Sequence, residues 1–312
     1  MSVPRQARVR ALAKLNLDLR VLGKRPDGFH ELRTIFQTIS LADSIDISFA
    51  AARRTAVELD DALGIEDNLA AKAALLVLDA MRITGRIAMR LTKRIPMGAG
   101  LGGGSSDAAA VLLPVPVLAG RTLPLAELCA LAKMPGSDVP FFLLGGTAAG
   151  IGRGEELFPL PEVPSLPGLL ITPDVHVPTA QAYARLSPRL TTESQQNKIF
   201  SFQSMVWGGG VSEEACNDFE AVVLREHPHL RILKQRLAEA GASPALMTGS
   251  GSAVYGLFRT GKEVQTALKT FKSERTFRIS LVDRTRYRAM WWRALEEHID
   301  QKLWPPRSRY AR

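Results

Sequence analysis

The sequence feature that most constrains the fold is a glycine-rich stretch between a strand-like segment and a helix-like one. Five of the seven residues from 98 to 104 are glycine, and two serines, an aspartate and an alanine-rich run follow them. Glycine accepts positive φ angles and lets a ligand approach the backbone. Exposed N–H groups at a helix start, together with the helix dipole, favour an anion such as phosphate. The stretch therefore predicts a phosphate-binding turn, with Ser105 and Ser106 available to cap the following helix.

Several other interpretations of this loop are disfavoured. A flexible linker would not lie between an apolar strand and an alanine-rich helix. The P-loop pattern G-x-x-x-x-G-K-[ST] is absent from the sequence. Gly98, Gly100 and Gly103 do match G-x-G-x-x-G, but a dinucleotide site also needs an acidic residue at the end of a following strand. The corresponding region reads "LAGRTLPLAEL", so a nicotinamide-dependent oxidoreductase is a weak alternative.

Composition places the chain among soluble globular proteins. Its 312 residues are 46% hydrophobic and 23% charged, which fits one large domain or two ordinary ones. No apolar run reaches the roughly 18–20 residues of a membrane span, and the N-terminal stretch has no continuous apolar core of a signal peptide. Cys129 and Cys216 are the two cysteines and lie far apart in sequence. We therefore expect a cytoplasmic protein without a disulfide framework.

The positive charge is concentrated in the C-terminal tail. Of the net charge of +9, the segment 284–312 carries +5, from eight Lys or Arg against three Asp or Glu, together with three of the four tryptophans. The rest of the chain is not a strongly basic nucleic-acid binder. For the tail, a helix packed on its own domain or on a dimer mate is favoured over a surface for membrane or RNA. We expect truncation after Asp283 to leave the chemistry in place.

Hydrophobic periodicity predicts a mixture of strands and helices. Antiparallel strands over 8–23 and within 31–49 flank a turn at 24–30, and a second block of strands and helices begins near residue 160. The helix after the glycine loop should end or kink near Leu113, because Pro114 and Pro116 follow. Residues 191–216 are largely polar, contain glycine and show no regular hydrophobic period, which predicts an irregular segment. The fold class is therefore α+β, with hairpins rather than repeated βαβ units.

Several motifs together resemble the GHMP kinases, the superfamily of galacto-, homoserine, mevalonate and phosphomevalonate kinases. The stretch "PMGAGLGGGSSDAAAVLL" is similar to their phosphate loop. The stretches "AKLNLDLRVLGKRPDGFHEL", "EDNLAAKAA", "GSDVPFFLLGGTAAGIGRGE", "NDFEAVV" and "ALMTGSGSAVYGLF" occur in the family's order and cover roughly residues 8–283. The finer similarity is to those members that phosphorylate a cytidine diphosphate ester of methylerythritol in non-mevalonate isoprenoid synthesis.

The resemblance implies a two-domain fold with substrates in the cleft between the domains. Residues 1–159 are expected to form an ATP-binding domain like the second domain of ribosomal protein S5. Residues 160–283 are expected to form a ferredoxin-like domain, and residues 284–312 form the tail. ATP would be the co-substrate and Mg²⁺ would bridge its phosphates. The expected partner is the small-molecule acceptor, with no nucleic acid and no membrane span, in a monomer or a homodimer.

Phosphoryl transfer to an alcohol needs an oriented hydroxyl group, a group that takes its proton, and positive charge near the phosphoryl oxygens. Asp138 in "GSDVPFF" is the candidate base, although the residues alone fit a helix-capping aspartate equally well. The resemblance places Lys14 beside this aspartate, where it would keep the base ionised and orient the hydroxyl. Asn16 is two residues further along the same strand and therefore shares a face with Lys14.

The resemblance also assigns the binding residues. His30 would read cytosine, Phe29 and Tyr183 would stack on the base, and Thr179 would contact the acceptor together with Asn16. The segment 248–252 ("TGSGS") would close the site from the second domain. The expected ATP-binding residues are Asn68, Pro96, Gly98, Gly100, Leu101, Gly102, Gly103, Gly104, Ser105 and Ser106.

Some positions depart from the family pattern. Phe29 stands where tyrosine is usual, Pro114 and Pro116 fall in what should be the helix after the loop, and Pro135 replaces a usual leucine before the catalytic turn. Two alternatives remain open: a GHMP kinase for a different alcohol, and a non-catalytic nucleotide-binding module. The second alternative is weakened because Lys14, Asp138 and the loop serines are all present.

Overall fold

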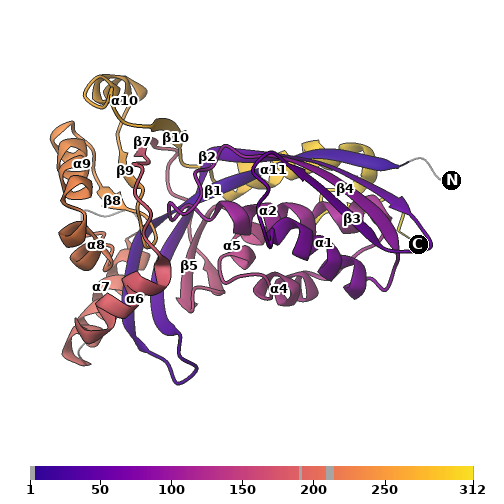
Figure 1. The fold of residues 1–312 in the computed structure, drawn as a ribbon, viewed down its shortest axis with the longest axis horizontal. Coiled ribbons are helices and arrows are strands. Elements are labelled where there is room, and N and C mark those ends of the chain that lie inside the picture. Colours follow the sequence, from indigo (N-terminus) through magenta and orange to yellow (C-terminus); the bar gives the residue numbers. More distant parts are fainter. Residues whose placement is uncertain (1–3, 190–191, 209–213, 312) are drawn as a thin grey trace.

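A long antiparallel hairpin connects the two parts of the molecule (Figure 1). The computed structural model describes residues 4–189, 192–208 and 214–311. Strands β1 (Arg5–Lys24) and β2 (His30–Ala51) form the hairpin. The first half of β2 pairs with β5 (Thr147–Gly152), and its second half pairs with β4 (Gly85–Thr92). This hairpin therefore extends from the core of the N-terminal part to the neighbourhood of the C-terminal part.

The N-terminal part is a six-stranded sheet packed against helices. Its strand order is β3-β4-β2-β5-β6, with β1 paired to β2. Strands β3 and β6 span Ala56–Asp61 and Glu156–Pro159. The helices are α1 (Leu69–Ala80), α2 (Gly103–Leu112), α3 (Pro114–Ala119), α4 (Leu125–Lys133) and α5 (Val139–Leu144). Buried apolar residues from the sheet, from α1–α5 and from the C-terminal tail form one core.

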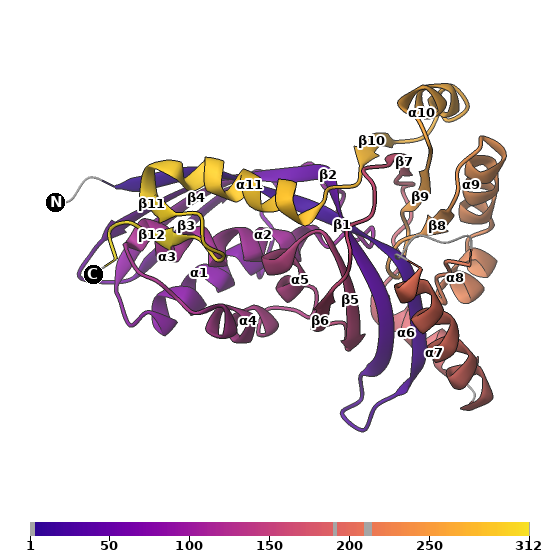
Figure 2. The same cartoon turned by 180° about the vertical axis from the view of Figure 1, so that it is seen from behind.

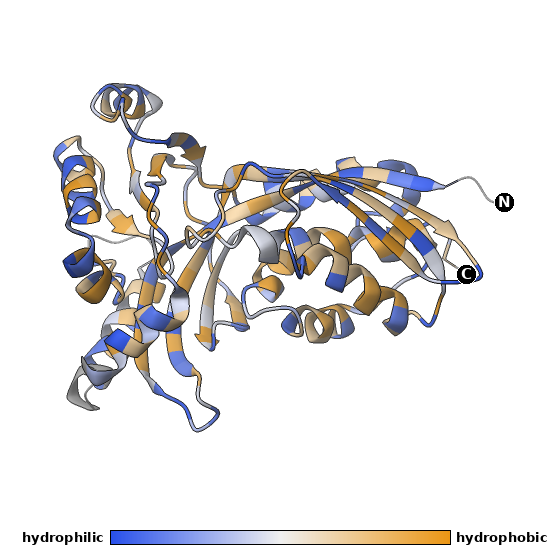
Figure 3. Cartoon of the chain, in the orientation of Figure 1, coloured by the Kyte–Doolittle hydropathy of each residue, from blue (hydrophilic) through white to orange (hydrophobic). Residues whose placement is uncertain are grey.

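Helix α2, which follows the glycine loop, lies deep inside this core. All its residues from Ser106 to Leu112 are buried, so small alanines fit where larger side chains would clash. Leu113 separates α2 from α3, which begins at Pro114. The expected interruption of the helix is therefore confirmed, since proline cannot donate the hydrogen bond that an uninterrupted helix needs. In Figure 3 the helices under the sheet are largely orange, whereas α8 and α9 alternate blue and orange.

The C-terminal part contains an antiparallel four-stranded sheet with strand order β10-β7-β9-β8. Its strands are β7 (Pro167–Ile171), β8 (Ala245–Met247), β9 (Val254–Leu257) and β10 (Thr276–Ser280). Its helices are α6 (Thr179–Leu186), η1 (Ser187–Arg189), α7 (Thr192–Trp207), α8 (Glu220–Glu226), α9 (Pro228–Glu239) and α10 (Gly261–Leu268). The mixed fold class expected from the sequence is confirmed.

Helix α7 corrects one expectation. The sequence predicts an irregular stretch over 191–216, yet Thr192–Trp207 is helical. Residues 190–191 and 209–213 lie outside the described part. Serine, threonine and asparagine have low helix propensity and hide the pattern in the sequence. Phe202 and Met205 are buried in the core between the two sheets. Tertiary packing therefore stabilises a helix that local propensity does not favour.

The C-terminal tail folds back onto the N-terminal part. Helix α11 (Arg284–Leu295) runs alongside β1 (Figure 2), and η2 (Glu296–His298), β11 (Ile299–Gln301) and β12 (Arg307–Ser308) follow. Tyr287, Trp291 and Leu295 are buried in the N-terminal core. The favoured interpretation, a helix packed on its own chain, is confirmed. Among the described residues, no helix combines the length and apolar character that crossing a membrane needs.

Candidate active site

Two adjoining cavities lie around the glycine loop. The larger, of about 740 Å³, is lined by both parts of the chain, including Lys14 and Asp138 from the N-terminal part and Thr179 from α6. The smaller, of about 450 Å³, follows the loop itself. Both cavities are lined by Leu69, Gly100, Gly102 and Ser105. A phosphate held at the loop would therefore lie at the boundary between the two cavities.

Alternate glycines give the loop its shape. Gly98, Gly100 and Gly102 have φ angles of 66°, 76° and 69°, which other residues adopt only with strain. A Cβ atom on Gly100 would also lie 2.2 Å from the carbonyl oxygen of Thr248. This close approach brings the segment 248–252 of the C-terminal part against the loop. Glycine is thus required at position 100 partly for a steric reason, because the C-terminal part of the chain lies against it.

The serine caps expected from the sequence are not formed. Helix α2 begins at Gly103, and its N-cap is Gly102, which has no side chain that could make a cap hydrogen bond. Both serines therefore lie within the first turns of the helix. Ser106 Oγ donates to the backbone oxygen of Leu12 at 2.7 Å, which ties α2 to β1. Ser105 lines both cavities and is the serine placed to meet a ligand.

A buried ion network at the base of the loop is a feature that sequence reasoning missed. Lys93 Nζ lies 2.5 Å from Asp43 Oδ2 and 2.7 Å from Asp107 Oδ2, and all three side chains are buried. Asp43 Oδ1 also accepts hydrogen bonds from the backbone N–H groups of Arg94 and Ile95. Lys93 and Asp107 flank the loop in sequence, so their contact closes its two ends. The signal that the sequence offered for this network was a pair of opposite charges, Lys93 and Asp107, on either side of the glycine run.

The electrostatics of this network depend on burial. Burial raises the pKa of Asp107 to about 7, although Lys93 opposes the shift. Burial lowers the pKa of Lys93, but the two carboxylates outweigh this effect and leave the pKa above its ordinary value. Asp107 Oδ1 has no hydrogen-bond partner within the described part of the chain. The lysine is thus held as a cation beside the cavity at the loop.

Lys14 and Asp138 meet as the resemblance implied. Lys14 Nζ lies 3.5 Å from Asp138 Oδ2, and the two side chains are 4% and 29% exposed. Asp138 occupies the N-cap position of α5 but makes no side-chain cap hydrogen bond. Its carboxylate therefore does not serve as a helix cap and points toward the cavity and Lys14. Burial lowers the pKa of Lys14, and the carboxylate of Asp138 acts in the opposite direction.

Asn16 connects the two parts of the chain at the bottom of the larger cavity. Its Oδ1 accepts from Lys14 Nζ at 2.7 Å and from the backbone N–H of Gly249 at 3.0 Å. Its Nδ2 donates to Thr34 Oγ1 at 2.8 Å. Lys14 and Asn16 do share a face of β1, as their spacing predicts. Because the amide is already engaged, Asn16 holds Lys14 and the segment 248–252 in place, and its predicted contact with the acceptor stays a prediction.

An aromatic group lines the other end of the larger cavity. The rings of His30 and Tyr183 are stacked, with centroids 4.5 Å apart. Phe29 is 52% exposed, and the guanidinium of Arg153 lies 4.1 Å from its ring centroid. All four residues line the same cavity. Rings in direct contact leave no room for a third ring between His30 and Tyr183, so a base would stack from another side. Arg153 was missed by sequence reasoning.

Helix α6 brings the C-terminal part to this cavity. Thr179 begins the helix and Tyr183 lies one turn later, so both face the same side. Thr179 Oγ1 and Ser250 Oγ are 2.8 Å apart, which connects α6 to the segment 248–252. His30 Nε2 lies 2.6 Å from Ser187 Oγ. Burial, and then the nearby Lys24, lower the pKa of His30, so its ring is neutral at pH 7.

The smaller cavity contains the residues expected to bind ATP except Ser106, which is buried and does not line it. Asn68 caps α1 by accepting from the backbone N–H of Ala70 at 3.0 Å, and its Nδ2 donates to Asp61. Of the residues predicted to contact ATP, those that line this cavity are Asn68, Pro96, Gly98, Gly100, Leu101, Gly102, Gly103, Gly104 and Ser105. The arrangement can hold a nucleotide whose terminal phosphate reaches the pair of Lys14 and Asp138.

Comparison with known proteins gives consistent results. The family descriptions "GHMP kinases N terminal domain" and "GHMP kinases C terminal" match residues 68–146 and 207–274. The chain is 65% identical over 314 residues to 4-diphosphocytidyl-2-C-methyl-D-erythritol kinase of Solibacter usitatus, covering 99% of each chain. It is 40% identical over 265 residues to the enzyme of the same name from Geobacter metallireducens, covering 84% of this chain and 92% of that one.

Solved structures agree with the sequence relatives. A crystal structure of 4-(cytidine 5'-diphospho)-2C-methyl-D-erythritol kinase superposes with a TM-score of 0.74 and 36% identity, covering 88% of this chain and 98% of that one. Homoserine kinase from Cytophaga hutchinsonii gives a TM-score of 0.69 at 19% identity, covering 91% and 97%, and shares the fold. The chain therefore belongs to the 4-diphosphocytidyl-2-C-methyl-D-erythritol kinase family, with the two-domain GHMP kinase fold.

Proposed function

We propose that the protein transfers the γ-phosphoryl group of ATP to the 2-hydroxyl of 4-diphosphocytidyl-2-C-methyl-D-erythritol, a step of non-mevalonate isoprenoid precursor synthesis. The observation that carries the proposal is the contact between Lys14 and Asp138 where the two cavities adjoin. It provides a carboxylate and a cation at the place where a terminal phosphate and an alcohol would meet. Family membership supports the choice of acceptor.

In this reaction Asp138 accepts the proton of the attacking hydroxyl as the new P–O bond forms. Lys14 orients the hydroxyl and the carboxylate, and its charge opposes the charge that develops on the phosphoryl oxygens. Asn16 holds the lysine ammonium through its Oδ1, at 2.7 Å. The donors of the glycine loop and the start of α2 hold the phosphates of ATP. ADP leaves with the oxygen that bridged its β-phosphorus to the γ-phosphorus.

Mg²⁺ would join the site together with the nucleotide. Among the described residues, no group of three or more His, Cys, Asp or Glu side chains is arranged to hold a metal ion. Mg²⁺ commonly keeps several waters and binds through substrate phosphates with one or two protein oxygens. Ser105, which lines both cavities, fits such a role. When bound, the ion would neutralise phosphate charge.

For the acceptor, the proposal places the cytosine at the aromatic end of the larger cavity and the alcohol at Asp138. His30 Nε2 is engaged by Ser187 Oγ, whose hydroxyl donates to the backbone oxygen of Tyr183. Nδ1 of the neutral ring is therefore left to accept a hydrogen bond from the base edge, while Phe29 or Tyr183 offers a face for stacking. Thr179 and Ser250, on the C-terminal side, would contact the diphosphate or the alcohol. The predicted residues for the acceptor thus lie along one cavity.

A coupled ADP-release assay across candidate alcohols tests the proposal. We expect turnover with 4-diphosphocytidyl-2-C-methyl-D-erythritol, competitive inhibition by CDP or CMP, and no turnover with homoserine or mevalonate. ADP release with another alcohol alone, without any effect of cytidine nucleotides, would assign the chain to a different GHMP kinase activity. Asp79→Asn, an exposed carboxylate on α1 outside both cavities, serves as a control for variants of Asp138.

A further inference from the structure

The C-terminal tail contacts the helix that carries the candidate base. Helix α5 has only six residues and directly follows Asp138. So short a helix is not stable by itself, and the last carbonyl groups of any helix lack partners within it. Where these carbonyls find donors therefore decides how firmly the helix, and Asp138 with it, is held.

Three side chains of the tail supply those donors. Tyr287 Oη donates to the backbone oxygen of Phe142, and Trp304 Nε1 donates to that of Leu143 at 3.1 Å. Arg284 Nε donates to the oxygen of Gly145, the C-cap residue, at 3.2 Å. The end of α5 is thus bonded to the tail at three of its carbonyls. A guanidinium at this end also complements the negative pole of the helix dipole.

The packing at this end leaves little space. Gly145 has a φ angle of 67°, and a Cβ atom on it would lie 2.2 Å from Tyr287 Cδ1. Tyr287 is 1% exposed and belongs to the same core as Phe141 and Phe142. The ring of Tyr287 therefore covers the end of α5 directly, and the glycine is required there by the tail.

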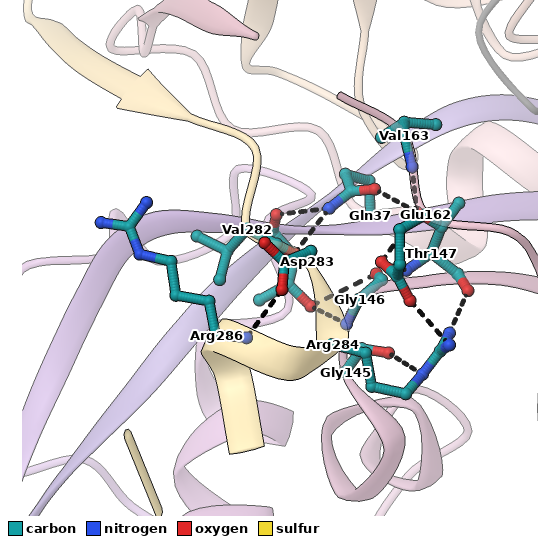
Figure 4. A network of polar contacts seen from close by, with 11 residues as sticks. Gln37, Gly145, Gly146, Thr147, Glu162, Val163, Val282, Asp283, Arg284 and Arg286 are labelled. Atoms are coloured by element: carbon teal, nitrogen blue, oxygen red, sulfur yellow. Dashed lines mark hydrogen bonds and ion pairs between the residues drawn. The ribbon is translucent and has the colours of Figure 1, made fainter. Parts of the chain in front are cut away.

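The tail is in turn fixed to the sheet where it begins (Figure 4). Gln37 Nε2 donates to the backbone oxygen of Val282 at 2.9 Å, and Asp283 caps α11 by accepting from the N–H of Arg286 at 2.7 Å. Arg284 also pairs with Glu162 at 2.6 Å. Strand β2, the start of α11 and the end of α5 therefore form one connected unit.

We propose that the tail is a positioning element for catalysis and that Arg284 and Tyr287 are positioning residues, which hold α5 so that Asp138 stays beside Lys14. The Lys14–Asp138 contact spans α5 and β1 at 3.5 Å. A displacement of about 1 Å at reacting groups can cost 10²-fold in rate. This inference rests on the proposed function and predicts the opposite of what the sequence alone led us to expect for tail removal.

The test uses the full chain with two substitutions that remove donors while preserving most of the packing. Tyr287→Phe keeps the ring, and Arg284→Met keeps a long unbranched side chain but has neither the cation nor a donor. In the double variant we expect kcat to fall by about 10- to 100-fold, with the KM for ATP within about twofold of wild type. Amides of α5 should exchange hydrogen faster while those of α1 do not. Arg284→Lys combined with native Tyr287 should recover most of the lost rate.

A stability control separates positioning from simple loss of folding. Leu295→Ala creates a cavity in the same tail helix without removing a donor to α5, so it should lower the melting temperature and leave kcat unchanged. If the double variant kept kcat within twofold of wild type, or if Leu295→Ala lowered kcat equally at a matched melting temperature, the positioning role would be wrong. If wild type itself failed to phosphorylate the cytidine acceptor, the proposed function would fail, and exchange at α5 would still report on the tail contacts.

Discussion

Replacing Asp138 by asparagine separates a catalytic carboxylate from a structural one. The substitution keeps the size of the side chain and removes its charge. Asp138 stands at the N-cap of α5 without a cap hydrogen bond, so the change removes no capping interaction. Its contact with Lys14 is 3.5 Å long, and the carboxylate is 29% exposed. Because the carboxylate is partly exposed, its removal should cost less stability than the roughly 3–5 kcal/mol lost when one partner of a fully buried pair is removed.

The expected effect on rate is much larger than the effect on stability. Loss of a general base commonly costs about 10²–10⁴ in rate, which is about 3–5 kcal/mol of transition-state stabilisation. A loose transition state needs little proton transfer early and would place the loss near the lower end. The smaller cavity, where ATP is proposed to bind, does not include Asp138, so the affinity for ATP should stay nearly unchanged.

The measurement is a coupled ADP-release assay with saturating ATP, together with nucleotide titration and a thermal melt of each variant. Asp79→Asn provides the matched control for a change of net charge. Turnover by Asp138→Asn within a factor of about two of wild type, in a folded protein that binds ATP, would refute the assignment of the base. A large loss of ATP affinity would instead mean that the substitution disturbs the glycine loop.

Three further predictions concern binding and pH. Phe29→Ala and Tyr183→Ala should each raise the acceptor KM by at least about 10-fold and leave the KM for ATP almost unchanged, whereas Phe29→Tyr should be nearly neutral. Equal increases of both KM values that follow a lowered melting temperature would contradict this prediction. Because the pKa of His30 is lowered, the acceptor KM should be constant between pH 8 and pH 7 and should rise at lower pH, where the ring becomes protonated. His30→Gln should abolish this rise, and a rise that persists in the variant would mean that another group titrates. Burial raises the pKa of Asp107 to about 7 from 3.8, so its contribution to stability is full below pH 3.8 and is lost as the pH rises through about 7. Asp107→Asn should therefore become more stable relative to wild type between pH 5 and pH 8 in nucleotide-free melts, whereas a constant difference would show that the group does not titrate there.

Features that depend on neighbouring residues could be predicted from the sequence of this protein. The glycine run between a strand and a helix, and the prolines after Leu113, act through backbone angles and missing donors, which are properties of neighbouring residues. The structure confirms positive φ angles at the alternate glycines and the break between α2 and α3. It also brings Lys14 and Asp138 together, as the family motifs implied.

Other features depend on residues that are distant in sequence, and only the tertiary structure decided them. Helix α7 forms because Phe202 and Met205 find a core, although the local propensity is poor. The stacking of Tyr183 on His30, the network of Lys93, and the donors of the tail to α5 connect segments that are separated by up to 161 residues. No local pattern encodes such pairs, because their free energy is gained only when packing excludes water and places a donor against an otherwise unpaired acceptor.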